Sequence, residues 1–515
     1  MKSLITKRQL LFVILVLLCG INPIYADTSK KLYVSPGNLS DLLPERERFK
    51  ITDLTLSGQL DIRDLEVIRQ MGRCHESVDS RYNGHLRYLD LSDAEFVGDG
   101  TFKIYLGGNS FTMSQFNGGS GDDLFRDMES LHTIKLPNSL EIMGGYLFVG
   151  CESLTSVTLP KSLKTLPDWT LISSFEENDN LTSILIDDSN PYYSSDGSAL
   201  FDKYKTKMFL AVKSLREYAI PSSVSEISTY AFSNCRHLKT LVLPLRLKGE
   251  NVAIRFQDCD SLYSISVDEK NPYLCSDGSV LYNKDKSELV FVCHTVRKMS
   301  IPSTVTKIGD YAFYNCTDLT SIELPSGVTS LGNNAFQGCT NLSSLTLPSG
   351  VKEIGLSAFQ GCKSLTSVTI PSGVKYINSS TFSDCESLRF INLPSDLKYI
   401  GKEAFANCTG LTSIYAFMEK PCEIDEMTFE NETIINATLY VPKGSLLDYW
   451  DDNQWKKFMN IEEFDVTSIG SLNTNANDVQ EVSRYSDNGQ RLNTPAKGLN
   501  IVKYNNGTVK KIMVK

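Results

Sequence analysis

The sequence has few of the residues and motifs that carry enzyme chemistry. It contains only five histidines in 515 residues, and no two of them stand at a metal-binding spacing such as H-E-x-x-H. It has no G-x-S-x-G nucleophile turn and no G-x-x-x-x-G-K-[ST] phosphate loop. Cys74, His75 and His85 form the nearest approach to a cluster, and an ordinary loop explains them. We therefore predict no catalytic, metal-binding or cofactor-binding residue, and a protein that is not an enzyme.

Positively charged residues are also fewer than negatively charged ones. Lysine and arginine number 51 against 61 aspartate and glutamate, giving a net charge of −10 and a pI near 5.2. Nucleic-acid and anionic-membrane partners favour a basic surface, so this balance argues against both. One long apolar run exists, Leu10–Leu18, and it is too short to cross a bilayer. We expect no nucleic-acid partner and no membrane span.

The N-terminal segment, 1–26, has the pattern of a secretory signal peptide. Lys2, Lys7 and Arg8 precede the apolar run, and cleavage after Ala26 fits the small residue such sites require. The alternative is a lipoprotein cut before Cys19, which the bulky residue before that cysteine disfavours. The predicted location is therefore outside the cell, either at the surface in association with the outer membrane or secreted.

A repeat of 23 residues organises the chain and is clearest from Thr317 to Gly410. Each unit follows the frame L-x-x-I-x-L-P-x-x-V-x-x-I-x-x-x-A-F-x-x-C, and a fixed period in this range is typical of a solenoid. Side chains alternate along a strand, so the apolar positions of L-x-x-I-x-L point inward and the intervening ones outward. The predicted fold is a β-rich leucine-rich repeat solenoid of stacked coils, with a parallel sheet on one face.

The coils are counted from the first leucine equivalent of each unit. They start at Leu86, Leu131, Leu154, Leu181, Leu215, Leu238, Leu262, Val296, Leu319, Leu342, Leu365, Leu388 and Leu411. Two units, those that start at Leu181 and Leu262, are longer than their neighbours and carry related insertions that begin at Asn190 and Asn271. Each has S-D-G between apolar runs, which predicts a β-hairpin standing out from the solenoid. Asp-Gly turn chemistry explains the acidic residues there better than a calcium loop does.

Thirteen cysteines in an exported chain would ordinarily suggest disulfides. Eight of them, however, share one slot in the repeat: Cys151, Cys235, Cys259, Cys316, Cys339, Cys362, Cys385 and Cys408. We interpret them as a column of buried thiols, with a disulfide framework or a metal column as the lesser alternative. Cys74, Cys275, Cys293 and Cys422 lie off the column. Whether Cys275 pairs with Cys293, which flanks the same insertion, is left open.

The array needs a cap at each end, because its terminal coils would otherwise expose apolar surface. Ile51–Gly58 alternates as a strand does, and Asp61–Met71 has helical spacing. The expected segments are a signal peptide (1–26), an N-terminal cap with irregular repeats (27–130), a solenoid (131–430) with insertions near 187–214 and 268–295, a C-terminal cap (431–465), a linker (466–482) and a small β module (483–515).

The outward strand positions are mostly short hydroxyl side chains, which make a flat polar face. Aromatic residues depart from this pattern near the C-terminal end and in the insertions, and exposed aromatics are good interface anchors. The alternative is that the C-terminal segment covers Phe390 and Tyr415. The candidate ligand contacts are Phe390, Asn392, Tyr415, Glu323, Tyr192, Tyr193 and Tyr273.

From Leu131 to Phe458 the repeats resemble those of the BspA-like leucine-rich repeat proteins, which are exported surface proteins of anaerobic and host-associated bacteria. The residues from Arg484 to Lys515 are similar to the C-terminal sorting domains of type IX secretion cargo, which would make export machinery a further partner. The resemblance implies adhesion: non-catalytic binding of an extracellular protein or glycan on host matrix or another bacterium. The second hypothesis is an accessory or scaffold protein in nutrient capture.

Overall fold

The structure is a computed structural model, and it describes residues 28–514 apart from 74–83, 98–102, 107–108, 113–123, 167–170, 172, 176–177, 250–251, 257, 467–480, 487–490, 493, 495–497 and 505–508. The predicted signal peptide, Cys19, Cys74 and most of the predicted linker lie outside the described residues. The chain divides into two compact units, Met1–Ser214 and Leu215–Lys515, and each is described by itself.

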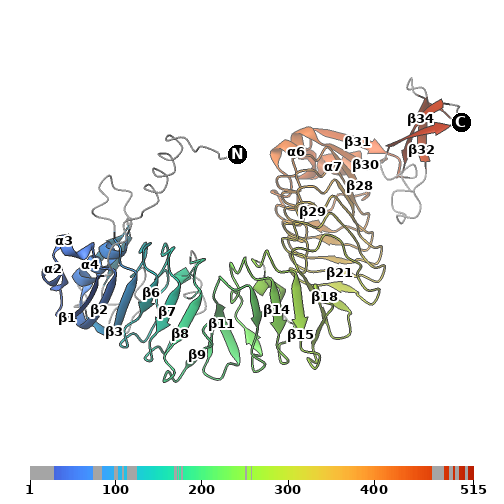
Figure 1. The fold of residues 1–515 in the computed structure, drawn as a ribbon. Coiled ribbons are helices and arrows are strands. Elements are labelled where there is room, and N and C mark those ends of the chain that lie inside the picture. Colours follow the sequence, from blue (N-terminus) through green and yellow to red (C-terminus); the bar gives the residue numbers. More distant parts are fainter. Residues whose placement is uncertain are drawn as a thin grey trace, which may run out of the picture. The chain divides into compact units, whose positions relative to one another are not determined.

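The first unit is built on one parallel sheet of six strands. In order these are β1 (Ser29–Val34), β2 (Asp53–Leu60), β3 (Tyr88–Phe96), β6 (Thr133–Lys135), β7 (Ser156–Leu159) and β8 (Ser183–Ile186) (Figure 1). The strand predicted at Ile51–Gly58 is β2, and the predicted helix is α4 (Ile62–Gly72). A separate antiparallel pair consists of β4 (Lys103–Leu106) and β5 (Asn109–Thr112). The lead-in therefore extends the sheet of the repeats.

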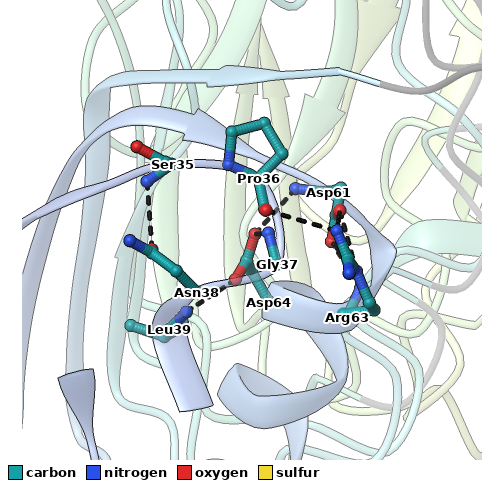
Figure 2. Close-up of polar contacts among 8 residues, drawn as sticks. All are labelled: Ser35, Pro36, Gly37, Asn38, Leu39, Asp61, Arg63 and Asp64. Atoms are coloured by element: carbon teal, nitrogen blue, oxygen red, sulfur yellow. Dashed lines mark hydrogen bonds and ion pairs between the residues drawn. The ribbon is translucent and has the colours of Figure 1, made fainter. Parts of the chain in front are cut away.

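One buried carboxylate accepts hydrogen bonds from separate segments of the N-terminal cap. Asp64, in the first turn of α4, is 1% exposed and accepts hydrogen bonds from the backbone N–H groups of Gly37 (2.7 Å), Leu39 (2.9 Å) and Asp61 (2.9 Å) (Figure 2). Asp61 in turn accepts from the backbone N–H of Arg63. These bonds join α4 to the loop before α2 (Leu39–Leu42), and a second short helix, α3 (Glu45–Arg48), follows. A buried carboxyl group is tolerated here because its oxygens accept three backbone hydrogen bonds.

In the second unit, the L-x-x-I-x-L segments form the first wall. Each predicted coil start is followed two residues later by a strand, except that no strand of the described residues follows Val296 in this way. The parallel groups are β12 (Glu217–Ala219), β14 (Thr240–Leu243) and β15 (Ser264–Val267); β20 (Ser321–Glu323) and β22 (Ser344–Thr346); and β24 (Ser367–Thr369), β26 (Phe390–Leu393), β28 (Ser413–Ala416), β30 (Thr438–Pro442) and β31 (Asn460–Phe464). The predicted solenoid fold is confirmed.

The V-x-x-I segments form the second wall of the coils. Its short strands are β13 (Glu226–Ile227), β19 (Lys307–Ile308), β21 (Ser330–Leu331), β23 (Glu353–Ile354), β25 (Tyr376–Ile377), β27 (Tyr399–Ile400) and β29 (Glu423–Ile424). A 3₁₀ turn, η3 (Ala253–Phe256), takes this place in one coil. Gly338 (φ +74°) stands in the turn before Cys339, where its left-handed backbone suits glycine.

The insertions are three-stranded antiparallel ribbons. The first comprises β9 (Tyr193–Ser195), β10 (Ala199–Asp202) and β11 (Lys207–Ala211), and the second comprises β16 (Leu274–Ser276), β17 (Val280–Asn283) and β18 (Glu288–Val292). The prediction that they stand out from the solenoid is wrong. In the first insertion Ala199, Leu200 and Phe201 of β10 are 0% exposed, so this ribbon is part of the core. The second is also part of the array. Its last strand, β18, pairs in parallel with β19 and so joins the second wall. The turn chemistry is confirmed, because Asp196 Oδ1 accepts from the backbone N–H groups of Ser198 and Ala199.

A buried asparagine fastens each insertion to the preceding coil. Asn271 is 0% exposed, and its Nδ2 donates to the carbonyls of Pro244 (2.9 Å) and Leu247 (3.1 Å). Its Oδ1 accepts from the backbone N–H groups of Tyr273 (2.8 Å) and Leu274 (2.9 Å). Asn190 is bonded in the same manner in the first insertion. The asparagine of the N-P-Y motif is therefore structural.

The Asn271→Asp variant is expected to lose about 2–3 kcal/mol of unfolding free energy, because a carboxylate oxygen would replace the donor that faces two carbonyls. Denaturant titration measures this loss. Asn283→Asp, in which the affected amide nitrogen bonds to the hydroxyl of Ser287 at the end of β17, is the control and is expected to lose under about 1 kcal/mol. Equal losses in the two variants would contradict the fastening role of Asn271.

Two ladders fill the space between the walls in the second unit. The rings of Phe313, Phe336, Phe359, Phe382, Phe405 and Phe429 stack with centroids 4.7–5.5 Å apart and planes within 9° of parallel. Beside them lies the cysteine column. The Cys339 thiol donates to the carbonyl of Phe313 (3.0 Å), and Cys408 donates likewise to Phe382 (3.0 Å). Each coil thus bonds to the next through side chains as well as strands.

None of the described cysteines forms a disulfide, and the column members are buried. The buried-thiol interpretation is therefore confirmed for Cys151, Cys235, Cys259, Cys316, Cys339, Cys362, Cys385 and Cys408. Cys275 and Cys293 are also unpaired, so the disulfide that the sequence left open is not formed in this structure. A small polarisable thiol suits this inner corner because it both packs and donates.

The C-terminal cap closes the phenylalanine ladder. It contains α6 (Asn431–Asn436), α7 (Leu446–Asp451) and the 3₁₀ turn η4 (Trp455–Lys457). Trp455 is fully buried beside Phe429, and its Nε1 donates to the carbonyl of Cys422 (2.8 Å). Trp450, in contrast, is 52% exposed.

A four-stranded antiparallel sheet follows, in the order β33 (Arg491–Leu492), β32 (Glu481–Ser486), β34 (Gly498–Tyr504) and β35 (Val509–Val514). The alternating sequence at this end predicted a β module, and the described strands form one.

Candidate functional site

The outer face of the first wall carries aligned rows of small polar side chains. Ser321 lies opposite Ser344, and Glu323 opposite Thr346, in the register of β20 and β22. All four are exposed. This part of the face is flat and has one ionisable group, Glu323, which the sequence placed correctly on the outer face.

The face becomes aromatic toward the C-terminal end. Tyr415 on β28 lies opposite Tyr440 on β30, and their rings stack with centroids 4.6 Å apart and planes 11° from parallel. Phe464 on β31 meets Tyr415 edge-on at 5.8 Å and Phe417 at 5.3 Å. We call Tyr415, Tyr440, Phe417 and Phe464 the aromatic platform. Its members are all half-buried, so each keeps some ring surface in contact with solvent.

Two of the predicted contacts at this end are half-buried and one is buried. Phe390 and Tyr415 are half-buried, and burial raises the pKa of Tyr415. Phe464 belongs to the closing strand, so the C-terminal segment shields Tyr415 in part. Asn392 is only 4% exposed, and the prediction of a surface contact there is wrong. The reason is its position, since it lies on β26 directly between Thr369 and the large ring of Tyr415.

The tyrosines of the insertions also fall into an exposed and a buried group. Tyr192 and Tyr273 occupy equivalent places, and they are 50% and 46% exposed. Tyr193 is only 9% exposed; it packs edge-on against Phe209 at 5.6 Å, and its hydroxyl donates to the carbonyl of Lys164. The prediction that Tyr193 contacts ligand is therefore wrong, because its side chain belongs to the core of the first unit.

Tyr273 borders a shallow cavity of about 420 Å³, together with Pro272, Asn283, Lys284 and Asp285. The ammonium of Lys284 is held by the carbonyl of Glu269 at 3.1 Å. A second cavity, of about 500 Å³, lies between the loops that follow β26 and β28 and includes Lys398, Phe417 and Lys420 in its lining. Both are open surface hollows, suited to part of a larger ligand.

The outer face carries side chains that can make hydrogen bonds and ring contacts. Within the described part of the chain, no three His, Cys, Asp or Glu side chains come together as a metal site would require. Across the same residues, no helix has the length and apolar character needed to cross a membrane. The outer strand positions of the second unit offer hydroxyls, aromatic rings and a few carboxylates, among them Glu323 and Glu462, which lies opposite Tyr440.

Sequence reasoning missed three of the four platform residues. Tyr440 stands at the outward position of A-T-L-Y-V-P, and strand alternation alone would have found it. Phe417 follows the end of β28, and Phe464 lies on a strand, β31, that has no counterpart in the repeat frame. These two had no sequence signal, because their positions depend on how the cap packs.

Comparison with known families settles the kind of repeat. A family profile described as "BspA type Leucine rich repeat region" matches residues 97–201, 120–259, 198–278, 286–412 and 377–477, which together span well over half of the chain. The chain belongs to the BspA-type leucine-rich repeat family. The expected resemblance of the repeats is thereby confirmed. No curated protein sequence matches the chain.

Solved structures of other leucine-rich repeat proteins are similar to it in part. A leucine-rich repeat protein from Eubacterium ventriosum is 16% identical, covering 79% of this chain and 83% of its own (TM-score 0.39). A leucine-rich cell surface protein from Faecalibacterium prausnitzii is 22% identical over 61% and 86% (0.40). The pneumococcal vaccine antigen PcpA is 15% identical over 85% and 84% (0.38). At these TM-scores the likenesses support no functional argument.

Proposed function

We propose that this BspA-type protein is an exported surface protein that binds an extracellular protein or glycan without catalysis, and so mediates adhesion to host matrix or to neighbouring cells. The aromatic platform carries the proposal. Stacked, half-buried rings at one end of a wall that elsewhere carries exposed hydroxyls combine apolar contact area with adaptable hydrogen bonding. A repeat array also offers an extended surface for such contact.

The proposal is tested by probing the chain that lacks its predicted signal peptide against an array of matrix proteins, plasma proteins, mucins and glycans. Saturable binding to one class supports adhesion. Silence across the array counts against it, and turnover of a peptide or glycan library would overturn the non-catalytic part of the proposal.

For any ligand so found, Tyr415→Ala is expected to weaken binding about tenfold or more, because exposed aromatic anchors dominate interface energies. Surface plasmon resonance measures the change. Tyr204→Ala is the matched control, since Tyr204 is 83% exposed and lies in the first insertion. Thermal melting of both variants separates lost contact from lost stability. Unchanged affinity in Tyr415→Ala would remove the platform from the binding site.

An accessory or scaffold role in nutrient capture is the second candidate. Tyr273, with its cavity and its exposed counterpart Tyr192, favours contact with a small or extended ligand at the insertions. A free oligosaccharide that binds at these tyrosines and leaves the platform unaffected would support this role over adhesion.

The C-terminal β module is proposed as an address for export machinery, and intact-mass measurement of the exported chain would show whether it is removed.

A further inference from the structure

Three lysines recur at the same place in successive coils of the second wall. Lys352, Lys375 and Lys398 each stand one residue before the outward position of β23, β25 and β27, and all three are exposed. The backbone N–H of Lys398 donates to the carbonyl of Lys375 at 2.8 Å. Stacked strands lie about 4.8 Å apart, so the three ammonium groups begin from backbone positions spaced at that interval. We call these residues the lysine column.

The column is left without acidic partners. Among the described residues, none of its three ammonium groups lies within ion-pair distance of a carboxylate. Lysines at other coil junctions are paired: Lys307 with Glu288 at 2.8 Å, and Lys363 with Glu386 at 2.8 Å. Like charges at this spacing repel one another, and an anionic partner would relieve that repulsion.

Aromatic rings accompany the column. Tyr376 is 56% exposed and lies opposite Tyr399 in the register of β25 and β27. Both stand directly beside the lysines, and flat phenol rings can pack against the apolar faces of sugar rings. The 500 Å³ cavity continues the column past Lys398 and adds a further ammonium, that of Lys420.

Acidic side chains stand next to the lysine column and limit the length of its positively charged surface. Glu353 stands beside Lys352, Asp396 precedes Lys398, and Glu419 and Glu423 share the cavity with Lys420. A duplex or a long single-stranded nucleic acid has a high charge density, so these carboxylates would repel its phosphates. A polymer with separated charges can place one anionic group at each lysine and avoid them.

We propose that the lysine column binds a linear anionic polysaccharide that carries a carboxylate or sulfate on successive sugar rings. The geometry supports this ligand because one lysine for each coil matches a polymer with one charge for each ring. The tyrosines supply apolar contact between the charges. The lysines lie on the second wall and the stacked rings of Tyr415 and Tyr440 on the first, and the two surfaces meet at the 500 Å³ cavity, which Lys398 and Phe417 both line. The experiment changes the lysines alone, so it can fail while the proposal for the platform stands.

The experiment compares binding of heparin and of polygalacturonate to the chain that lacks only its predicted signal peptide. The variant is Lys352→Gln with Lys375→Gln and Lys398→Gln. The control is Lys239→Gln with Lys270→Gln and Lys298→Gln, which removes the same charge from exposed lysines that form no column. We expect about tenfold weaker binding of at least one glycan by the column variant, under twofold change in the control, and a shallower salt dependence in the column variant.

Three outcomes would overturn the proposal. One is no binding of either glycan by the unaltered protein. The second is an equal loss in the two triple variants, which would mark the interaction as general charge attraction. The third is tighter binding of single-stranded DNA than of either glycan. Replacing the same three lysines with arginine keeps the charge and is expected to retain binding, which separates the charge requirement from any change in folding.

Discussion

Replacing Phe359 with alanine is expected to lower the free energy of unfolding of the second unit by about 3–5 kcal/mol. Phe359 is fully buried, and its ring stacks between Phe336 at 5.4 Å and Phe382 at 5.3 Å. Its carbonyl also accepts the thiol of Cys385. The strand hydrogen bonds on both walls fix the spacing of the coils, so the neighbouring rings cannot close the cavity that truncation leaves.

Denaturant unfolding followed by hydrogen exchange measures this loss and locates it along the array, where unfolding need not be two-state. Phe359→Leu should cost less, about 1–2 kcal/mol, because it fills part of the space. The matched control is Leu356→Ala in the same coil, where the side chain is 49% exposed and the expected loss is under about 1 kcal/mol. Equal losses at positions 356 and 359 would show that the ladder does not hold the coils together.

The cysteine column is expected to be inert toward thiol reagents in the folded protein and fully reactive in denaturant. Burial raises the pKa of Cys151 to about 12 and of Cys408 to about 12, and only the thiolate is a nucleophile. Counting reactive thiols at pH 8 with and without denaturant measures this. Cys275 is half-buried and is expected to react first. Rapid labelling of the whole column in the native protein would contradict the burial.

The same raised pKa values predict alkaline unfolding. The folded state keeps each column thiol protonated up to a higher pH than the unfolded state does, where the ordinary pKa is about 9. The stabilisation is therefore complete below pH 9 and is lost as pH rises toward 12. In this range the free energy of unfolding falls by about 1.4 kcal/mol per pH unit for each such thiol. Cys408→Ala is expected to reduce the slope by about one thiol's share, and Cys275→Ala by less.

Much of the fold could be predicted from the repeat. Apolar residues at fixed places in a 23-residue frame determine which side chains face inward, because alternation along a strand is a local property. The fixed frame also placed Cys339 and its counterparts in one buried column. It also placed Glu323 on the outer face correctly.

The errors share a physical cause. Strand alternation does not say which neighbour a strand will pair with, so β18 was expected to stand out as half of a hairpin and instead joins the second wall. Alternation also cannot tell an exposed outward position from a covered one. Asn392 and Tyr193 both lie at positions that looked accessible, and the rings of Tyr415 and Phe209 lie beside them.

The sequence by itself determined the solenoid and its thiol column, since both follow from a period and from local alternation. Only the tertiary structure decided the surfaces. The pairing of Tyr415 with Tyr440, the cover that Phe464 provides, and the lack of carboxylate partners for Lys352, Lys375 and Lys398 among the described residues depend on which coils stack and how the cap closes them. Those contacts join residues far apart in the chain, and only the packing of one coil on the next brings them together.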